Sequence, residues 1–146
     1  MYAGRITSNM IKAIYSTLKI NTSKEELDPI IDEMQRKTLI IIPIYNAYEE
    51  TKACIESVKK YTLLPYELVL INDCSTDSRI EQLLTELSKE DNVFFVNNQS
   101  NQGFVRNINI GFSISGDKDV VMLNSDTIVT YKWLQKLKFA AYSDSK

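Results

Sequence analysis

The stretch Thr38-Leu39-Ile40-Ile41-Ile42-Pro43-Ile44-Tyr45-Asn46 decides the fold of this chain. Residues 39–42 form an unbroken, mostly β-branched apolar run, which is typical of a strand buried on both faces of a parallel sheet. We expect the proline that follows to end this strand. The aromatic and polar residues of the stretch then lie just beyond its carboxyl end.

Three further apolar runs predict strands at residues 67–71, 93–96 and 120–123. Helical periodicity predicts helices at about residues 47–61, 78–89, 103–115 and 131–141. Asp77 is expected to cap the second of these helices. Strands that alternate with helices of this length predict an α/β fold, a Rossmann-like three-layer α/β/α arrangement with a mainly parallel sheet.

The first 37 residues are expected to form a separate helical extension. Apolar side chains recur at every fourth position and predict a helix over residues 6–20: Ile6, Met10, Ile14 and Leu18. A second, short helix is expected to run to about residue 36. Either Ser23 and Glu26 form a capping box at its start, or Asp28 caps it with Pro29 in the first helical position. The α/β domain then comprises residues 38–146.

The composition excludes several classes of protein. Seventeen basic residues oppose nineteen acidic ones, giving a net charge of -2, so no basic patch indicates a nucleic-acid partner. We find neither a secretory signal nor an apolar run that could span a membrane. Cys54 and Cys74 match no zinc motif, and we interpret both as reduced, part-buried residues. We expect a cytoplasmic protein, either free or peripheral to the inner face of the membrane.

Polar side chains follow every predicted strand. They are Tyr45, Asn46, Asn72, Asp73, Asn97, Asn98, Asn101, Asn124 and Asp126. Open parallel sheets bind ligands beyond the carboxyl ends of their strands, and this set can hydrogen-bond a base, a ribose and a metal–phosphate group. For any one of these residues, the alternative is that Asn and Asp follow strands because they form turns and cap helices.

The chain lacks the glycine-rich loops that cradle phosphates in P-loop and dinucleotide-binding proteins. A divalent cation, Mg²⁺ or Mn²⁺, held by Asp126 is the natural means to neutralise a diphosphate, because histidine is absent and one carboxylate plus phosphate oxygens and water suffices. The amides at the start of the helix at Gly103, with Arg106, would supplement this cation, unless Arg106 is a surface residue.

Between residues 38 and 133 the chain resembles the family 2 glycosyltransferases, which are inverting enzymes of the glycosyltransferase A fold. Four motifs carry the resemblance through their order and spacing: Leu39-Ile40-Ile41-Ile42-Pro43-Ile44-Tyr45-Asn46, Leu70-Ile71-Asn72-Asp73-Cys74-Ser75-Thr76-Asp77, Asn101-Gln102-Gly103 with Arg106-Asn107 and Gly111, and Leu123-Asn124-Ser125-Asp126.

The resemblance implies a donor site for a UDP- or dTDP-sugar used in polysaccharide or glycoconjugate synthesis. Pro43 and Tyr45 would lie near the base, Asp73 would accept a hydrogen bond from the pyrimidine ring nitrogen, and Asp126 would bind the metal. The family's Asp-x-Asp motif begins here with Asn124, as in the branch that acts on bacterial surface polysaccharides. The nucleotide-binding set implied in this way is Pro43, Tyr45, Asn46, Asp73, Asn101, Gly103, Arg106 and Asn124.

The same resemblance places the acceptor half of the family beyond Lys146, together with the general base and the site for a saccharide or lipid-linked acceptor. We therefore expect this chain to bind a donor without transferring its sugar. The alternative is a non-catalytic module of the same fold that binds a nucleotide or a partner chain. A phospho-acceptor receiver domain is disfavoured, because no acidic pair follows the first strand and no lysine the last. The N-terminal apolar stripe leaves a homodimer open.

Overall fold

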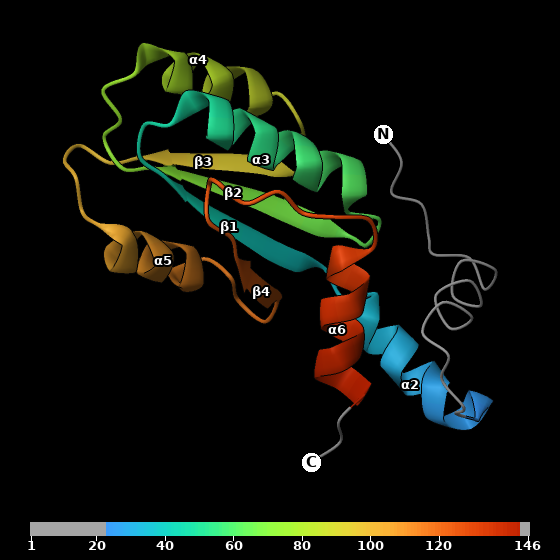
Figure 1. Cartoon of the computed structure of the whole chain (residues 1–146). Helices are drawn as coiled ribbons and strands as arrows, with labels where there is room; N and C mark the ends of the chain where they lie inside the picture. Colours follow the sequence, from blue (N-terminus) through green and yellow to red (C-terminus); the bar gives the residue numbers. More distant parts are fainter. Residues whose placement is uncertain (1–22, 144–146) are drawn as a thin grey trace.

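The computed structural model describes residues 23–143 and alternates helices with strands along the chain (Figure 1). The elements are α2 (Lys24–Met34), β1 (Thr38–Ile44), α3 (Tyr48–Tyr61), β2 (Tyr66–Asn72), α4 (Ser78–Leu87), β3 (Val93–Asn97), α5 (Phe104–Ser113), β4 (Asp119–Met122) and α6 (Trp133–Ser143). The predicted strands and helices of the α/β region are confirmed to within a few residues. The helix predicted for residues 6–20 lies outside the described residues.

The four strands form one parallel sheet in the order β3-β2-β1-β4. Helices α3 and α4 cover one face of this sheet and α5 lies against the other (Figure 1). The predicted three-layer α/β/α arrangement is therefore confirmed. β1 lies between β2 and β4, and all seven of its residues are buried.

Alternate residues of β1 face the two sides of the sheet. Ile40, Ile42 and Ile44 belong to the larger core cluster, with α3 and α4. Leu39 and Ile41 belong to a smaller cluster with Ile108 of α5. This double burial explains why the strand has no polar residue between positions 39 and 44.

Helix α5 approaches β1 so closely that Gly111 has no room for a side chain. A Cβ atom at this position would lie 2.4 Å from Cδ1 of Ile41 and 2.7 Å from its Cγ2. Glycine is therefore required here by the helix–sheet contact, since α5 places it in ordinary helical conformation.

The prediction that Pro43 ends the first strand is wrong, because β1 continues to Ile44. The carbonyl of Ile44 accepts the amide of Asp73, on the β2 side, and the carbonyl of Ile41 accepts the amide of Leu123, on the β4 side. Successive residues of a strand face alternate neighbours, so Pro43 faces β4, whose last residue is Met122. The missing N–H of the proline thus falls where β4 ends, and no ladder bond is lost within the strand.

Helix α2 begins with a capping box. The amide of Ser23 donates to Oε2 of Glu26 at 3.0 Å, and Oγ of Ser23 accepts the amide of Glu26 at 3.4 Å. The alternative start, with a cap at Asp28 and Pro29 in the first position, is wrong, since the proline lies inside the helix. The helix packs against α6, and within residues 23–143 no helix is long and apolar enough to cross a membrane (Figure 1).

A buried lysine joins α6 to the sheet and to the end of α2. Lys138 is 4% exposed and pairs with Asp119, the first residue of β4, at 2.7 Å. Its ammonium also donates to the carbonyl of Arg36 at 2.5 Å and to Oγ1 of Thr38 at 3.2 Å. Tyr142 donates to the same aspartate. The buried ammonium group of Lys138 is tolerated because these hydrogen bonds and the carboxylate of Asp119 offset the cost of removing it from water.

The two cysteines have different environments. Cys54 is buried on α3, and burial raises the pKa of its thiol to about 11. Cys74 is exposed in the loop after β2, at a φ of 61°. The interpretation of both as part-buried residues is therefore wrong for Cys74, whose turn conformation directs it away from the core.

Candidate functional site

The loops that follow β1, β2 and β3 lie together at one edge of the sheet, on the left in Figure 1. This edge is the carboxyl end of the parallel strands, where the sequence places its polar residues. The structure separates these residues into two groups. The side chains of one group form hydrogen bonds within the protein, and those of the other face solvent.

Asp73, which directly follows β2, is 3% exposed and accepts hydrogen bonds from the loop before α5. Its Oδ1 accepts the amide of Gln102 at 2.7 Å and Nδ2 of Asn98 at 2.9 Å, and its Oδ2 accepts the amide of Gly103 at 2.9 Å. Burial raises the pKa of Asp73, but these hydrogen bonds together with Asn107 outweigh burial, and the pKa lies below its usual value. The carboxylate is therefore ionised at neutral pH.

This carboxylate occupies the N-terminus of α5. Gly103 is the N-cap residue of the helix, at a φ of 79°, and no side chain of its own satisfies the first turn. The amide of Gly103, which the sequence offers to a diphosphate, instead donates to Asp73. The anion that a helix start favours is thus supplied by the protein.

Carboxamide side chains link the strand ends to one another. Nδ2 of Asn72 donates to Oδ1 of Asn97 at 3.0 Å, and Oδ1 of Asn72 accepts the amide of Ser75 at 3.0 Å. Nδ2 of Asn98 donates to Oδ1 of Asn107 at 2.6 Å as well as to the neighbouring carboxylate. For these asparagines the turn-forming alternative holds, because their side chains form hydrogen bonds with polar groups at the strand ends and in the loops.

Asn107 is a residue of this network that the sequence-based site prediction does not include. It is 1% exposed and lies on the same face of α5 as Gly103 and Gly111, four residues from each. A single carboxamide on the buried face of the helix, beside Ile108 and Gly111, is the signal that could have identified it, since a buried polar group needs a partner.

Asn46 is also turned toward the protein. Its Oδ1 accepts the amides of Thr76 and Asp77 at 2.8 and 3.1 Å, and Oγ1 of Thr76 at 3.2 Å. Its own amide donates to Oγ of Ser75 at 2.9 Å. The loop after β1 is therefore fastened to the loop after β2.

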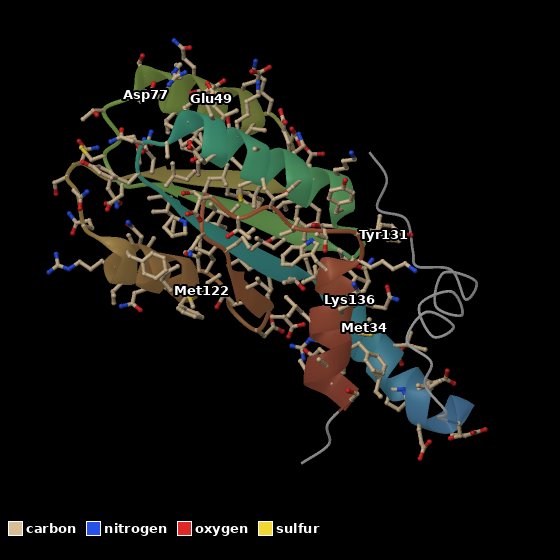
Figure 2. The ribbon with its side chains drawn as sticks, viewed as in Figure 1. Met34, Glu49, Asp77, Met122, Tyr131 and Lys136 are labelled. Carbon is tan, nitrogen blue, oxygen red and sulfur yellow. The ribbon has the colours of Figure 1, made fainter. Side chains whose placement is uncertain are left out.

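An arginine that the sequence does not single out braces the same two loops. Arg79 donates to Asp77 at 2.7 Å and to Glu49 at 3.1 Å, and its guanidinium lies 4.5 Å from the ring centroid of Tyr48. Figure 2 shows Asp77 and Glu49 at the adjacent starts of α4 and α3. Asp77 also caps α4 as predicted, by accepting the amide of Arg79.

The second group of predicted site residues remains exposed. Tyr45 is 53% exposed beside Pro43, which is buried at the end of β1. Asn101, Asn124 and Asp126 are also exposed. Arg106 is exposed in the first turn of α5 and donates to Oε1 of Gln102 at 3.1 Å. These side chains face solvent, in contrast to the hydrogen-bonded group.

Asp126 lies in a loop that the protein holds at several points. The amide of Thr127 donates to the carbonyl of Asn124 at 3.1 Å, and the amide of Val129 donates to Oγ of Ser57 at 3.0 Å. Residues 23–143 contain no group of three or more His, Cys, Asp or Glu side chains that could enclose a metal ion. One exposed carboxylate still fits a Mg²⁺ or Mn²⁺ ion that completes its shell with phosphate oxygens and water.

Comparisons with known sequences show which proteins the chain resembles. Residues 39–145 match the family model described as glycosyl transferase family 2. An uncharacterised glycosyltransferase of Haemophilus influenzae is 31% identical over 99 residues, which are 67% of this chain and 30% of the relative. The glycosyltransferase GlyG of Streptococcus pneumoniae is 26% identical over 98 residues, 67% of this chain and 33% of the relative. This chain thus spans about a third of the length of these relatives.

Solved structures share the fold. Residues 1–349 of TarS from S. aureus align with a TM-score of 0.61 and 24% identity over 72% of this chain and 31% of that one. GalNAc-T7, crystallised with UDP, GalNAc and Mn²⁺, aligns with a TM-score of 0.65 and 21% identity over 75% of this chain and 22% of that one. Both comparisons confirm the glycosyltransferase A fold. The chain belongs to glycosyl transferase family 2.

Proposed function

We propose that this chain binds a nucleoside-diphosphate sugar, with UDP or dTDP as the nucleotide, together with Mg²⁺ or Mn²⁺ at the carboxyl edge of its sheet. One observation carries the proposal. After the internal hydrogen bonds are formed, the exposed groups at this edge are an aromatic ring, a guanidinium, a carboxamide and a carboxylate: Tyr45, Arg106, Asn124 and Asp126. These are the chemical groups that a base, a diphosphate, a ribose and a metal ion require.

Each exposed group has a role in the proposal. Tyr45 offers a ring face on which a base stacks, beside the backbone of Pro43. Arg106 offsets charge on the diphosphate, with Gly103 and Asn101 lining the loop below it. Asn124 accepts from the ribose hydroxyls. Asp126 would hold the divalent cation, which neutralises the phosphates when bound.

The preference for a pyrimidine rests on Asp73. Its pKa is lowered, so it remains an acceptor at neutral pH. Its Oδ2 accepts the amide of Gly103, and a carboxylate oxygen can accept more than one hydrogen bond. The ring N–H of uracil or thymine supplies a donor, and adenine has no ring N–H at the corresponding position. A related fold crystallised with UDP, that of TarS, supports the same nucleotide class.

For the whole protein we propose transfer of the sugar to a saccharide or lipid-linked acceptor, in polysaccharide or glycoconjugate synthesis. Residues 38–146 would be the donor-binding part and residues 1–37 an extension to it. The named relatives that match are glycosyltransferases, which favours this role over a non-catalytic module. No described residue is assigned as the general base.

Isothermal titration of the chain with UDP, dTDP and ADP, each with and without Mn²⁺, tests the proposal. We expect UDP or dTDP to bind at least about tenfold more tightly than ADP, the effect of one differential hydrogen bond. Chelation of the metal with EDTA should weaken binding. Equal affinities for UDP and ADP would contradict the pyrimidine preference, and the absence of any nucleotide binding would contradict the proposed function.

A further inference from the structure

The loop after β1 has a backbone conformation that needs external support. Asn46 and Ala47 both have positive φ, 57° and 52°, which is the left-handed region. This region costs about 1–2 kcal/mol for a residue with a Cβ atom, and Asn tolerates it better than most. Ala47 is the N-cap residue of α3 and forms no side-chain cap. The turn is therefore held by hydrogen bonds from elsewhere.

The side chain of Asn46 supplies that support. Its Oδ1 accepts two backbone amides and one hydroxyl from Thr76 and Asp77, thirty residues along the chain. Two N–H donors fix the orientation of the amide group, because Nδ2 could not accept them. The carbonyl of Asn46 also accepts Oγ1 of Thr51, at 3.4 Å. The side-chain oxygen is thus committed to the protein.

The hydrogen bonds that Oδ1 of Asn46 accepts from Thr76 and Asp77, called the clamp here, join the loops that carry the two residues proposed to contact the nucleotide base. Tyr45 immediately precedes Asn46, and Asp73 begins the loop that contains Thr76 and Asp77. Both loops leave neighbouring strands, and the carbonyl of Ile44 already accepts the amide of Asp73 at 2.8 Å. The clamp extends this contact beyond the sheet. It therefore holds the loop that begins with Tyr45 against the loop that begins with Asp73.

We propose that Asn46 is a positioning residue for nucleotide recognition, acting through its side-chain clamp on Thr76 and Asp77 without contacting the nucleotide. The proposal rests on the proposed function. It also changes the role that the sequence gives Asn46 among the nucleotide-binding residues. The nucleotide would be recognised by Tyr45 and Asp73, whose separation the clamp fixes.

Two substitutions separate positioning from direct contact. Asn46→Gly keeps the left-handed backbone accessible and removes the clamp. Asn46→Asp keeps an oxygen acceptor for both amides and replaces the Nδ2 donor, so that it preserves the clamp and removes any hydrogen bond that Nδ2 would donate to a ligand. Asn109→Ala, at an exposed position of α5, is the matched control for the loss of an asparagine.

Amide hydrogen exchange and ligand titration are measured on the same samples, at a temperature where urea unfolding shows each variant to be folded. Asn46→Gly should accelerate exchange at the amides of Thr76 and Asp77, whereas Asn46→Asp and Asn109→Ala should leave it close to the wild-type rate. Uridine is titrated by NMR alongside UDP with Mn²⁺. Because uridine is neutral, its affinity reports the effect of the clamp without the repulsion between the new aspartate and the phosphates of UDP.

We expect Asn46→Gly to weaken uridine and UDP binding by about tenfold, and Asn46→Asp to hold uridine binding within about threefold of wild type. If Asn46→Asp weakens uridine binding as much as Asn46→Gly does, Nδ2 contacts the nucleotide and the proposal is overturned. Unchanged binding by Asn46→Gly also overturns it. A wild-type chain that binds neither ligand rejects the proposed function and the positioning role with it, while the exchange rates still report whether the clamp exists.

Discussion

The carboxylate of Asp73 lies 2.9 Å from the amide of Gly103 and so joins the end of β2 to the start of α5. The two residues are thirty positions apart in sequence, with α4 and β3 between them. Because Asp73 is almost fully buried, the same bond ties the proposed base-recognition group to the helix that carries Arg106. Local stability and the proposed ligand recognition therefore both depend on one side chain.

Replacing Asp73 by Asn should destabilise the protein by about 1–3 kcal/mol at neutral pH, because an amide nitrogen would oppose an N–H donor in a buried place. The pKa of Asp73 is lowered in the folded state. Its contribution to stability is therefore present above the unfolded pKa and is lost as pH falls through the folded pKa. Urea unfolding from pH 7 into the acid range should show the difference between wild type and variant shrinking. A difference that grows with acid would contradict this account.

The Gly111→Ala substitution should cost about 1–3 kcal/mol or more, because its methyl group would overlap Ile41. A double-mutant cycle with Ile41→Ala tests the cause. The alanine at 111 should cost clearly less in the Ile41→Ala background, since all three contacting carbons are then absent. Additive losses would show that the close approach is not responsible.

Removing the buried ammonium by Lys138→Met should destabilise the chain by about 3 kcal/mol, the effect of leaving a partly buried carboxylate and a carbonyl without their partner. Asp119 keeps Tyr142 as a donor, which limits the loss. Thermal unfolding provides the measurement. The double substitution Lys138→Met with Asp119→Leu should recover part of the stability, and a double variant less stable than Lys138→Met would argue against a charge effect.

Asp126→Ala should abolish the dependence of nucleotide binding on Mn²⁺ without lowering stability by more than about 0.5 kcal/mol, because the side chain is exposed. Titration of UDP with and without Mn²⁺ measures the first effect, and urea unfolding the second. Asp117→Ala, another exposed aspartate outside the site, serves as the control. Mn²⁺ dependence that persists in Asp126→Ala would show that another group binds the metal.

In the folded chain a thiol reagent should modify Cys74 rapidly and leave Cys54 unreacted. Cys74 is exposed, whereas Cys54 is buried with its pKa raised to about 11, so that little thiolate forms. Ellman's reagent should detect one thiol before denaturation and two after it. Two rapidly reacting thiols in the folded protein would contradict the packing of α3 on the sheet.

The fold could be predicted from the sequence because burial of strands and helices requires apolar residues at regular positions. Ile40 and Ile41 face opposite sides of the sheet, and only a strand covered twice requires both to be apolar. The position of Pro43 within β1 could not be predicted from the sequence. A proline fits there because the pairing of β1 with β4 ends at Met122, so that β4 requires no hydrogen bond from the backbone of residue 43. That register is a tertiary property.

The candidate site was less predictable. The sequence identifies Asn46, Asn98 and Asn124 as polar residues after strands, and chemistry alone cannot tell which of them bind the protein. The side chains of Asn46 and Asn98 form hydrogen bonds to other loop residues, whereas Asn124 remains exposed. The partners of a carboxamide lie up to 31 residues away, and no local pattern encodes that pairing.

The carboxamide network has a thermodynamic consequence for any ligand that binds at this edge. Asn72, Asn98 and Asn46 already hold the loops in place by hydrogen bonds to residues of a neighbouring strand and of other loops. Little chain entropy then remains to be lost when a nucleotide arrives, and the edge is preorganised in the sense that lowers the cost of association. Binding should therefore proceed with a small change in heat capacity, as rigid docking requires, without the large one that accompanies coupled folding.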